Sequence, residues 1–270
     1  MIHPRNMPAD WHLRALTQGA EGSVSVTVSP DRASMGMLAA ADAAEAILEA
    51  LDNRGRARVV FASAPSQREM LYALATRDDL DWSRVEAFHM DEYVGVAAAA
   101  PQAFGQWLRD HLFVYANGGH LTAIDSNAPP EDEAEAYGAL VLSEPLDLVC
   151  LGIGQNGHLA FNEPRQAQLE DDRAARVVAL DLKSRQQQVS DGQFNHLDLV
   201  PTRAITLTVP TLLSARTIVG TVPGSSKSIA VAAALDGPIG TDCPASFLRT
   251  HDIVYLHLDE AAATNLDARS

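Results

Sequence analysis

The sequence contains two cysteines in 270 residues and no apolar run long enough to cross a membrane. A membrane-spanning helix needs about 18 consecutive apolar residues. Cys150 and Cys243 show no disulfide pattern, which favours reduced thiols in a cytosolic setting. The N-terminal residues, MIHPRNMPADWHL, lack the uninterrupted apolar segment of a signal peptide. We therefore expect a cytoplasmic protein without a membrane partner.

Positive charge is also scarce. The 20 Lys and Arg residues are outnumbered by 35 Asp and Glu residues, so the net charge is −15. Nucleic acid and anionic membranes would be repelled, and an anionic substrate would need a local site of cationic groups or backbone N–H groups. Apolar residues make up 47% of the chain, which is typical of a globular protein. The sequence does not reveal the oligomeric state, and a homo-oligomer stays open as an alternative to a monomer.

Strand and helix patterns alternate along the chain. Residues 23–29, SVSVTVS, alternate as an edge strand does, and Asp31 is suited to cap a long alanine-rich helix that ends near residue 52. Further strands are expected at 57–62, 85–90, 121–124, 146–151, 175–182, 204–209, 217–222 and 253–258. Helices are expected at 68–76, 101–112, 131–143, 225–235 and the C-terminus. This order predicts an α/β fold with a single doubly wound, mostly parallel sheet and helices on both faces. We expect one domain over residues 1–270, with 1–22 as an N-terminal arm.

The segment 146–164, LDLVCLGIGQNGHLAFNEP, is the most informative stretch. An apolar strand leads into a glycine-rich turn, at the end of the strand where ligands bind in open α/β sheets. Gly157 in this turn is expected to contact the substrate. His158 can accept and return a proton near neutral pH, and the carboxylate of Glu163 can orient it. This pair predicts proton transfer.

Two other loops should reach the same edge of the sheet. Asp91 follows the strand at 85–90, and Ser225-Ser226-Lys227 opens a helix after the strand at 217–222. Loops after parallel strands lie along one edge, so we expect Asp91 and Lys227 to converge on His158. Asp91 would be a second proton-transfer group, or only a solvated residue at a strand end. Lys227 and the helix N-terminus would bind an anion, unless Ser225 is an ordinary helix cap.

Cofactor and metal sites are less well supported. Residues 152–157 match the dinucleotide pattern G-x-G-x-x-G, but Pro164 ends the segment and the acidic ribose contact is missing. A metal site would use His89, Asp91, His158 and Glu163, whose spacing matches no recognised ligand pattern. We expect neither a cofactor nor a metal.

Three segments resemble the active-site motifs of glucosamine-6-phosphate deaminases, which share a superfamily with 6-phosphogluconolactonases. They are LGIGQNGHLAFNEP, FHMDEYVG and VPGSSKSIAV, and the resemblance runs from about residue 57 to 235. It implies a doubly wound α/β sheet. It also implies a reaction without a cofactor, in which an amino-sugar 6-phosphate becomes the ketose phosphate plus ammonia.

The resemblance also implies a role for each motif residue. His158, oriented by Glu163, would assist opening of the sugar ring, and Asp91 would take the C2 proton and return it at C1. Lys227 would hold the phosphate. Asn156 stands where some members have aspartate, and it would orient a neighbour by hydrogen bonding without carrying charge.

The phosphate end departs from the family pattern. Residues 63–67, SAPSQ, replace the usual threonine- and glycine-rich loop, which leaves Ser63 and Ser66 as the expected substrate contacts. Pro65 lacks an N–H donor. Ser190 or a nearby polar residue stands where an arginine is expected, and Arg185 is a candidate substitute. We therefore predict an isomerase or deaminase for glucosamine 6-phosphate or a close analogue.

Two other functions compete with this prediction. A lactonase of the same superfamily would use His158 but has no use for Asp91. A sugar-binding sensor without turnover would usually carry a DNA-binding segment, for which residues 1–22 are too few. The presence of Asp91, His158 and Glu163 favours the deaminase.

Overall fold

The computed structural model describes residues 12–14, 24–190 and 192–266. Within these residues the main sheet has eight strands in the order β1-β2-β11-β10-β7-β3-β4-β6. Their bounds are β1 His12–Arg14, β2 Val24–Ser29, β3 Ala57–Phe61, β4 Val85–His89, β6 His120–Thr122, β7 Leu148–Leu151, β10 Thr217–Val222 and β11 Val254–Asp259. β1 runs antiparallel to β2, and every other neighbouring pair is parallel. The predicted mostly parallel α/β sheet is confirmed.

Helices cover both faces of this sheet. One face carries α1 Arg32–Arg54, α2 Arg68–Ala75 and α3 Phe104–Leu108 with its π-helical extension Arg109–Phe113. The other carries α4 Pro130–Val141, α6 Val209–Leu213 and α7 Ser228–Asp236. Val59 of β3 packs in the first core and Val60 in the second, because successive strand residues point to opposite faces. Both halves of the doubly wound arrangement are therefore present.

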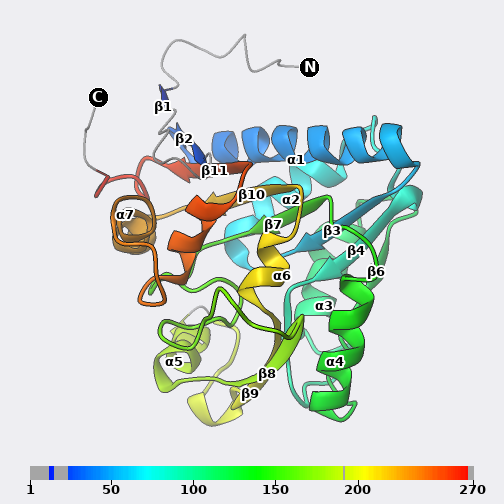
Figure 1. Cartoon of the computed structure of the whole chain (residues 1–270), viewed down its shortest axis with the longest axis vertical. Helices are drawn as coiled ribbons and strands as arrows, with labels where there is room; N and C mark the ends of the chain where they lie inside the picture. The colour runs from blue at the N-terminus through cyan, green and yellow to red at the C-terminus, as the bar shows by residue number, and fades with distance from the viewer. Residues whose placement is uncertain (1–11, 15–23, 191, 267–270) are drawn as a thin grey trace.

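A second, three-stranded antiparallel sheet has the order β5-β9-β8. Its strands are β5 Asp91–Tyr93, β9 Arg203–Leu207 and β8 Ala175–Ala179. The strands expected at 175–182 and 204–209 thus exist but lie outside the main sheet. Figure 1 shows β8 and β9, with the nearby α5 Leu182–Ser190, at the opposite end of the molecule from α1.

Several local expectations are wrong. β2 is not an edge strand, because β1 pairs with it. The rest of the expected arm, 1–11 and 15–22, lies outside the described residues. No helix is predicted between the strands expected at 175–182 and 204–209, yet this glutamine-rich stretch contains α5. Residues 260–266 after β11 form turns rather than the expected C-terminal helix.

The strand order places a crevice between β3 and β7. From β3 the chain moves outward to β4 and β6, whereas from β7 it moves the other way to β10 and β11. The loops after β3 and β7 consequently diverge, which opens a ligand site at their carboxyl ends. These loops hold the SAPSQ segment and the glycine-rich turn.

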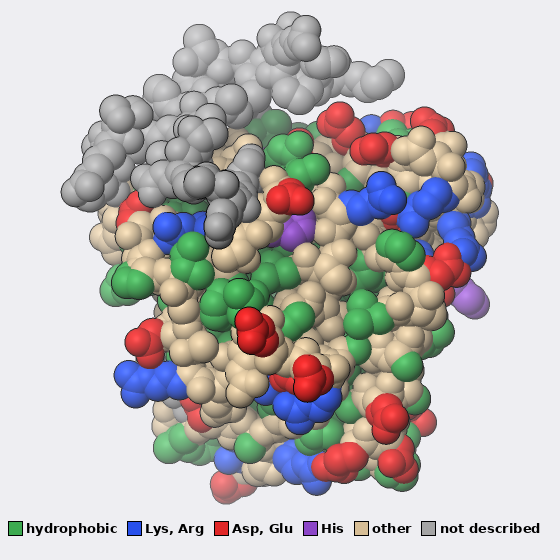
Figure 2. Space-filling view, in the orientation of Figure 1, with side chains coloured by type: hydrophobic (Ala, Val, Ile, Leu, Met, Phe, Trp, Pro, Cys, Tyr) green, Lys and Arg blue, Asp and Glu red, His purple; other side chains and the backbone are tan. Residues whose placement is uncertain are grey.

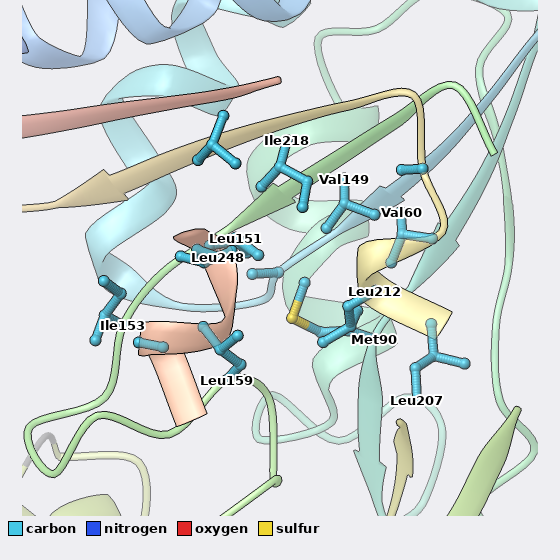
Figure 3. Packing of buried hydrophobic residues seen from close by; sticks show 14 of the residues in the cluster. Val60, Met90, Val149, Leu151, Ile153, Leu159, Leu207, Leu212, Ile218 and Leu248 are labelled. Carbon is cyan, nitrogen blue, oxygen red and sulfur yellow. The ribbon is translucent and has the colours of Figure 1, made fainter. Parts of the chain in front are cut away.

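The base of this crevice is a close-packed apolar core. Val149 of β7 lies opposite Val60 of β3 and Ile218 of β10. Met90 and Leu159, which directly adjoin Asp91 and His158 in the chain, are buried in the same cluster (Figure 3). The site residues are thus attached to a rigid support.

Surface charge on the face shown in Figure 2 is interspersed with apolar side chains. A group of basic side chains gathers near the C-terminal end of α1, where Arg54 pairs with Asp147 and Arg56 with Glu144. Among the described residues, no helix is long and apolar enough to span a membrane.

Candidate active site

A pocket lies at the crevice between β3 and β7, and five of the predicted site residues line it. They are Ser63, Ser66, Asp91, His158 and Lys227. Phe104, Trp107 and Phe161 form an apolar wall, and Gln188 and Gln193 contribute neutral polar groups. The other three predicted residues, Asn156, Gly157 and Glu163, lie outside this lining.

His158 is held against a buried carboxylate. Its Nδ1 lies 3.4 Å from Oε1 of Glu163, whose side chain is 3% exposed. The side-chain Nδ2 of Asn156 donates to Oε2 of Glu163 at 2.7 Å, and the side-chain Oδ1 of Asn156 accepts from the backbone N–H of His158 at 3.2 Å. Asn156 therefore ties the carboxylate and the imidazole-bearing residue together without adding charge.

Glu163 is ionised in this setting. Burial raises the pKa of the carboxyl, but hydrogen bonds and charge from His158, together with bonds from Ser184 and Asn156, outweigh burial and hold the pKa at about 2. A permanently charged carboxylate behind His158 fixes the ring orientation and stabilises an imidazolium.

Ser184 is a member of this network that the sequence reasoning missed. Its hydroxyl, buried in α5, donates to Oε1 of Glu163 at 2.5 Å. The sequence does contain a signal for the helix, because Asp181 is a residue type that caps helices and good helix formers follow it. In the structure the Asp181 carboxylate accepts from the Ser184 N–H at 2.6 Å, as a cap does. The contact with Glu163 itself has no local signature.

Glycines leave the space that the His158 imidazole occupies. A Cβ on Gly154 would lie 2.3 Å from three atoms of the His158 ring, so the ring packs directly over a bare backbone. Gly157 has φ +86°, and a Cβ there would also lie 2.6 Å from Sγ of Cys243. The glycine-rich turn thus serves packing of the ring and a left-handed backbone turn.

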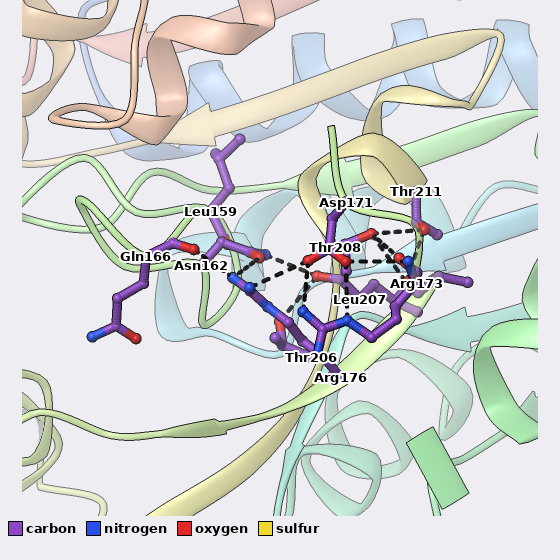
Figure 4. A network of polar contacts seen from close by, with 11 residues as sticks. Leu159, Asn162, Gln166, Asp171, Arg173, Arg176, Thr206, Leu207, Thr208 and Thr211 are labelled. Atoms are coloured by element: carbon purple, nitrogen blue, oxygen red, sulfur yellow. Dashed lines mark hydrogen bonds and ion pairs between the residues drawn. The ribbon is translucent and has the colours of Figure 1, made fainter. Parts of the chain in front are cut away.

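The far end of the loop is anchored by Asn162. The side-chain amide of this buried residue donates to the backbone carbonyl oxygens of Leu159 at 2.9 Å and Leu207 at 2.8 Å. Arg176 of β8 reaches the carbonyl oxygen of Gln166 and pairs with Asp171 (Figure 4). The chain around Glu163 is thereby attached to the small sheet.

Asp91 faces the pocket from a buried position. Burial raises the pKa of its carboxyl well above the ordinary 3.8, and the nearby charge of Glu92 acts in the same direction. Glu92 itself accepts hydrogen bonds from the backbone N–H groups of Phe104 and Gly105 at 3.0 and 2.9 Å. Only the first of the two adjacent carboxylates therefore belongs to the pocket.

The anion end of the pocket combines hydroxyls with one cation. Lys227 is the last residue of the 3-10 turn Ser225–Lys227, directly before α7, and it lines the pocket together with Ser63 and Ser66 from the loop after β3. The Ser63 hydroxyl is buried and has no hydrogen-bond partner among the described residues. Among the described residues that line the pocket, Lys227 is the single lysine or arginine.

A model of the glucosamine-6-phosphate isomerases/6-phosphogluconolactonase family matches residues 30–256. The chain belongs to this family. It is 34% identical to a glucosamine-6-phosphate deaminase of Streptococcus agalactiae over 201 residues, covering 72% of this chain and 82% of that protein. With the deaminase of Enterococcus faecalis the identity is 32% over 223 residues, covering 82% and 93%.

Solved structures agree with the family assignment. A monomeric glucosamine-6-phosphate deaminase superimposes with a TM-score of 0.81 at 28% identity, over 89% of this chain and 99% of that one. A 6-phosphogluconolactonase from Trypanosoma brucei shares the fold, with a TM-score of 0.73 at 19% identity, over 91% and 99%.

In this member of the glucosamine-6-phosphate isomerase family, Arg185 does not reach the anion end. Its guanidinium donates to the carbonyl oxygens of Leu197 and Val200 at 2.7 and 2.9 Å. Ser190 is exposed and bonds to the carbonyl of Gln186. Neither residue replaces the expected arginine, because both side chains are engaged with backbone away from the pocket.

The metal alternative also lacks geometric support. No group of three or more His, Cys, Asp or Glu side chains within the described ranges is placed to hold a metal ion. Nε2 of His89 accepts from the Ile124 N–H at 2.9 Å, and burial lowers the pKa of this histidine to about 3. His89 is therefore a neutral core residue.

Proposed function

We propose that this protein is an amino-sugar phosphate isomerase and deaminase. It would convert glucosamine 6-phosphate, or a close analogue, to the ketose phosphate and ammonia. The observation that carries the proposal is the placement of Asp91 and His158 in one pocket at the carboxyl ends of β4 and β7. The named relatives support the same chemistry.

Ring opening is the task that suits His158. The imidazole gives a proton to the ring oxygen and takes one from the C1 hydroxyl, and Glu163 supports its charged form. Asn156 and Glu163 act behind the ring as orienting groups.

Isomerisation is the task that suits Asp91. As a carboxylate it removes the C2 proton of the open-chain sugar, and the C–H electron pair forms the C1=C2 double bond. The C1 oxygen takes a proton from the ammonium group of the substrate, which gives the enolamine. The resulting carboxyl returns the proton to C1, which leaves an iminium group at C2. Water adds at C2, its two protons pass to the nitrogen, and the C–N bond breaks, which gives the ketose and ammonium (ammonia plus a proton). Burial raises the pKa of Asp91 above its ordinary 3.8, which makes the carboxylate a stronger base toward the C2 proton.

Lys227, Ser63 and Ser66 would bind the distal phosphate. Gly157 would act indirectly, through the left-handed turn that precedes His158. One lysine and two hydroxyls form a modest anion site, so a substrate with a different anionic group stays within the proposal. Phe104, Trp107 and Phe161 would pack against the apolar face of the sugar.

The test is an ammonia-release assay with glucosamine 6-phosphate, galactosamine 6-phosphate and unphosphorylated glucosamine. Ketose formation is measured in parallel, and deuterium at C1 is measured in D2O. We expect ammonia and ketose in equal amounts, abolished in Asp91→Asn and His158→Asn. Lys227→Met should raise KM for phosphorylated substrates more than it lowers kcat.

Two outcomes would contradict the proposal. Hydrolysis of 6-phosphogluconolactone that persists in Asp91→Asn, without ammonia release, would identify a lactonase. Binding of the amino sugars without turnover would identify a sensor.

A further inference from the structure

The helix α5 contacts the site at two points. Ser184 donates its hydroxyl to Oε1 of Glu163 at 2.5 Å, and Gln188 lines the pocket. These residues are four positions apart, which places both side chains on one face of the helix. One face of α5 thus touches the pocket and the carboxylate behind His158.

Ser184 and His158 both lie against one oxygen atom of Glu163. Oε1 of Glu163 accepts from Ser184 and also lies 3.4 Å from Nδ1 of His158. Nδ1 is buried and has no hydrogen bond of normal length within the described part of the chain. Oε2 is held separately by Asn156 at 2.7 Å. The position of the Ser184 hydroxyl therefore sets how closely Oε1 approaches the imidazole.

The other end of the helix face suits a sugar. Gln188 can both donate and accept hydrogen bonds, as a sugar hydroxyl can, and Gln193 lies beside it in the pocket wall. A neutral carboxamide adds no charge to the cleft that holds Asp91. The hydrogen bonds of Gln188 therefore depend on the position of the sugar hydroxyls rather than on the anionic group of the substrate.

We propose that α5 couples substrate recognition to the orientation of the catalytic histidine. Gln188 is a specificity-determining contact for the sugar, and Ser184 is a positioning residue that holds Glu163 against His158. A hydroxyl bound to Gln188 fixes α5 over the pocket and keeps Ser184 on Oε1. This inference rests on the proposed function.

Ser184→Ala tests the positioning role, and Ser190→Ala is its matched control. Ser190 lies on the same helix but is exposed and bonds only to the Gln186 carbonyl among the described residues. We expect Ser184→Ala to lower kcat about 10-fold, the scale of one charge-assisted hydrogen bond, with KM within about twofold of wild type. Ser184→Thr, which keeps the hydroxyl, should restore most of the rate. Ser190→Ala should match wild type.

Gln188→Ala tests the recognition role, with exposed Gln186→Ala as control. We expect KM to rise about 10-fold and the preference between the glucosamine and galactosamine phosphates to change. Equal kcat in Ser184→Ala and Ser190→Ala would overturn the positioning role, as would failure of threonine to restore the rate. An unchanged KM and preference in Gln188→Ala would overturn the recognition role.

A readout that does not require turnover separates this inference from the proposed function. In protein labelled with ¹⁵N-histidine, Ser184→Ala should shift the Nδ1 signal of His158, and Ser190→Ala should leave it in place. Wild-type protein that releases no ammonia would overturn the proposed function, and the NMR comparison would then decide the Ser184–Glu163–His158 linkage alone. If circular dichroism shows that Ser184→Ala is unfolded, Ser184→Cys, which keeps the volume with a weaker donor, takes its place under the same criteria.

Discussion

Asp91 and Glu92 are neighbours in β5, yet their carboxylates serve different structures. Asp91 faces the pocket, whereas Glu92 accepts from the first N–H groups of α3. Successive strand residues point to opposite sides, so one short strand supplies both a reactive group and a helix cap. Because α3 carries Phe104 and Trp107 into the pocket wall, the cap also supports the pocket.

Asp91→Asn should abolish activity and raise stability at neutral pH. Loss of a positioned base costs about 10²–10⁴-fold in rate. Burial raises the pKa of Asp91 above 3.8, so the folded protein holds this proton more tightly than the unfolded chain. The associated stability is complete below pH 3.8 and is lost as pH rises through the raised pKa. Asparagine does not ionise, so Asp91→Asn does not lose this stability as the pH rises.

Thermal melting between pH 4 and pH 8 measures this effect. The Tm of Asp91→Asn should approach that of wild type near pH 4 and exceed it at pH 8. A Tm difference that stays constant across the range would show that the carboxyl is not perturbed by burial.

Glu92→Gln should have the opposite signature, with activity retained and stability reduced. One carboxylate oxygen becomes an NH2 group that faces a backbone donor at Phe104 or Gly105. The loss of a hydrogen bond to a charged group costs about 1.5–3 kcal/mol. For a chain of this size that lowers Tm by roughly 2–4 °C per kcal/mol. Calorimetry and kcat at 20 °C measure the two effects, and a rate loss like that of Asp91→Asn would place Glu92 in the chemistry instead.

The parts of the fold that the sequence predicts are those with local signals. Continuous apolar strands and the glycines at 152–157 specify β7 and its turn without reference to the rest of the chain. The small sheet has no such signal, because β5 has three residues and pairs with β9 far along the chain. Its pairing is decided by tertiary packing.

The site shows the same division. Asp91, His158 and Lys227 could be predicted to converge because each follows a parallel strand, and they line one pocket. Ser184 could not be predicted, since its contact depends on how α5 lies over Glu163. The suggestion that Arg185 replaces the expected arginine is wrong for a similar reason. Its guanidinium donates to backbone carbonyl oxygens, and sequence patterns do not reveal such contacts.

Glu163→Gln should reduce stability in a way that depends on pH. The pKa of Glu163 is lowered from 4.5 to about 2, so its stabilising contribution is complete above pH 4.5 and is lost as pH falls toward 2. The full contribution is about 3 kcal/mol, and it declines by about 1.4 kcal/mol per pH unit below 4.5. Urea denaturation of both proteins at pH 7, 4.5 and 3 measures the difference. Equal differences at all three values would contradict the ionised network around His158.

Gly154→Ala should inactivate the enzyme while leaving most of its stability. The added Cβ would lie 2.3 Å from three atoms of the His158 ring, and the ring is the group most easily displaced because its side chain is partly exposed. Displacement would move the imidazole off Oε1 of Glu163 and out of register with the sugar, and misplacement by about 1 Å costs about 100-fold in rate.

Gly240→Ala is the matched control for Gly154→Ala, because a Cβ there meets no heavy atom within 4 Å. We expect kcat to fall at least 100-fold in Gly154→Ala with KM changed less, and wild-type kinetics in Gly240→Ala. A crystal structure of Gly154→Ala should show a rotated His158 ring. Full activity in that variant would mean that the ring works from another position, and the contact between His158 and Glu163 would then not be the catalytic one.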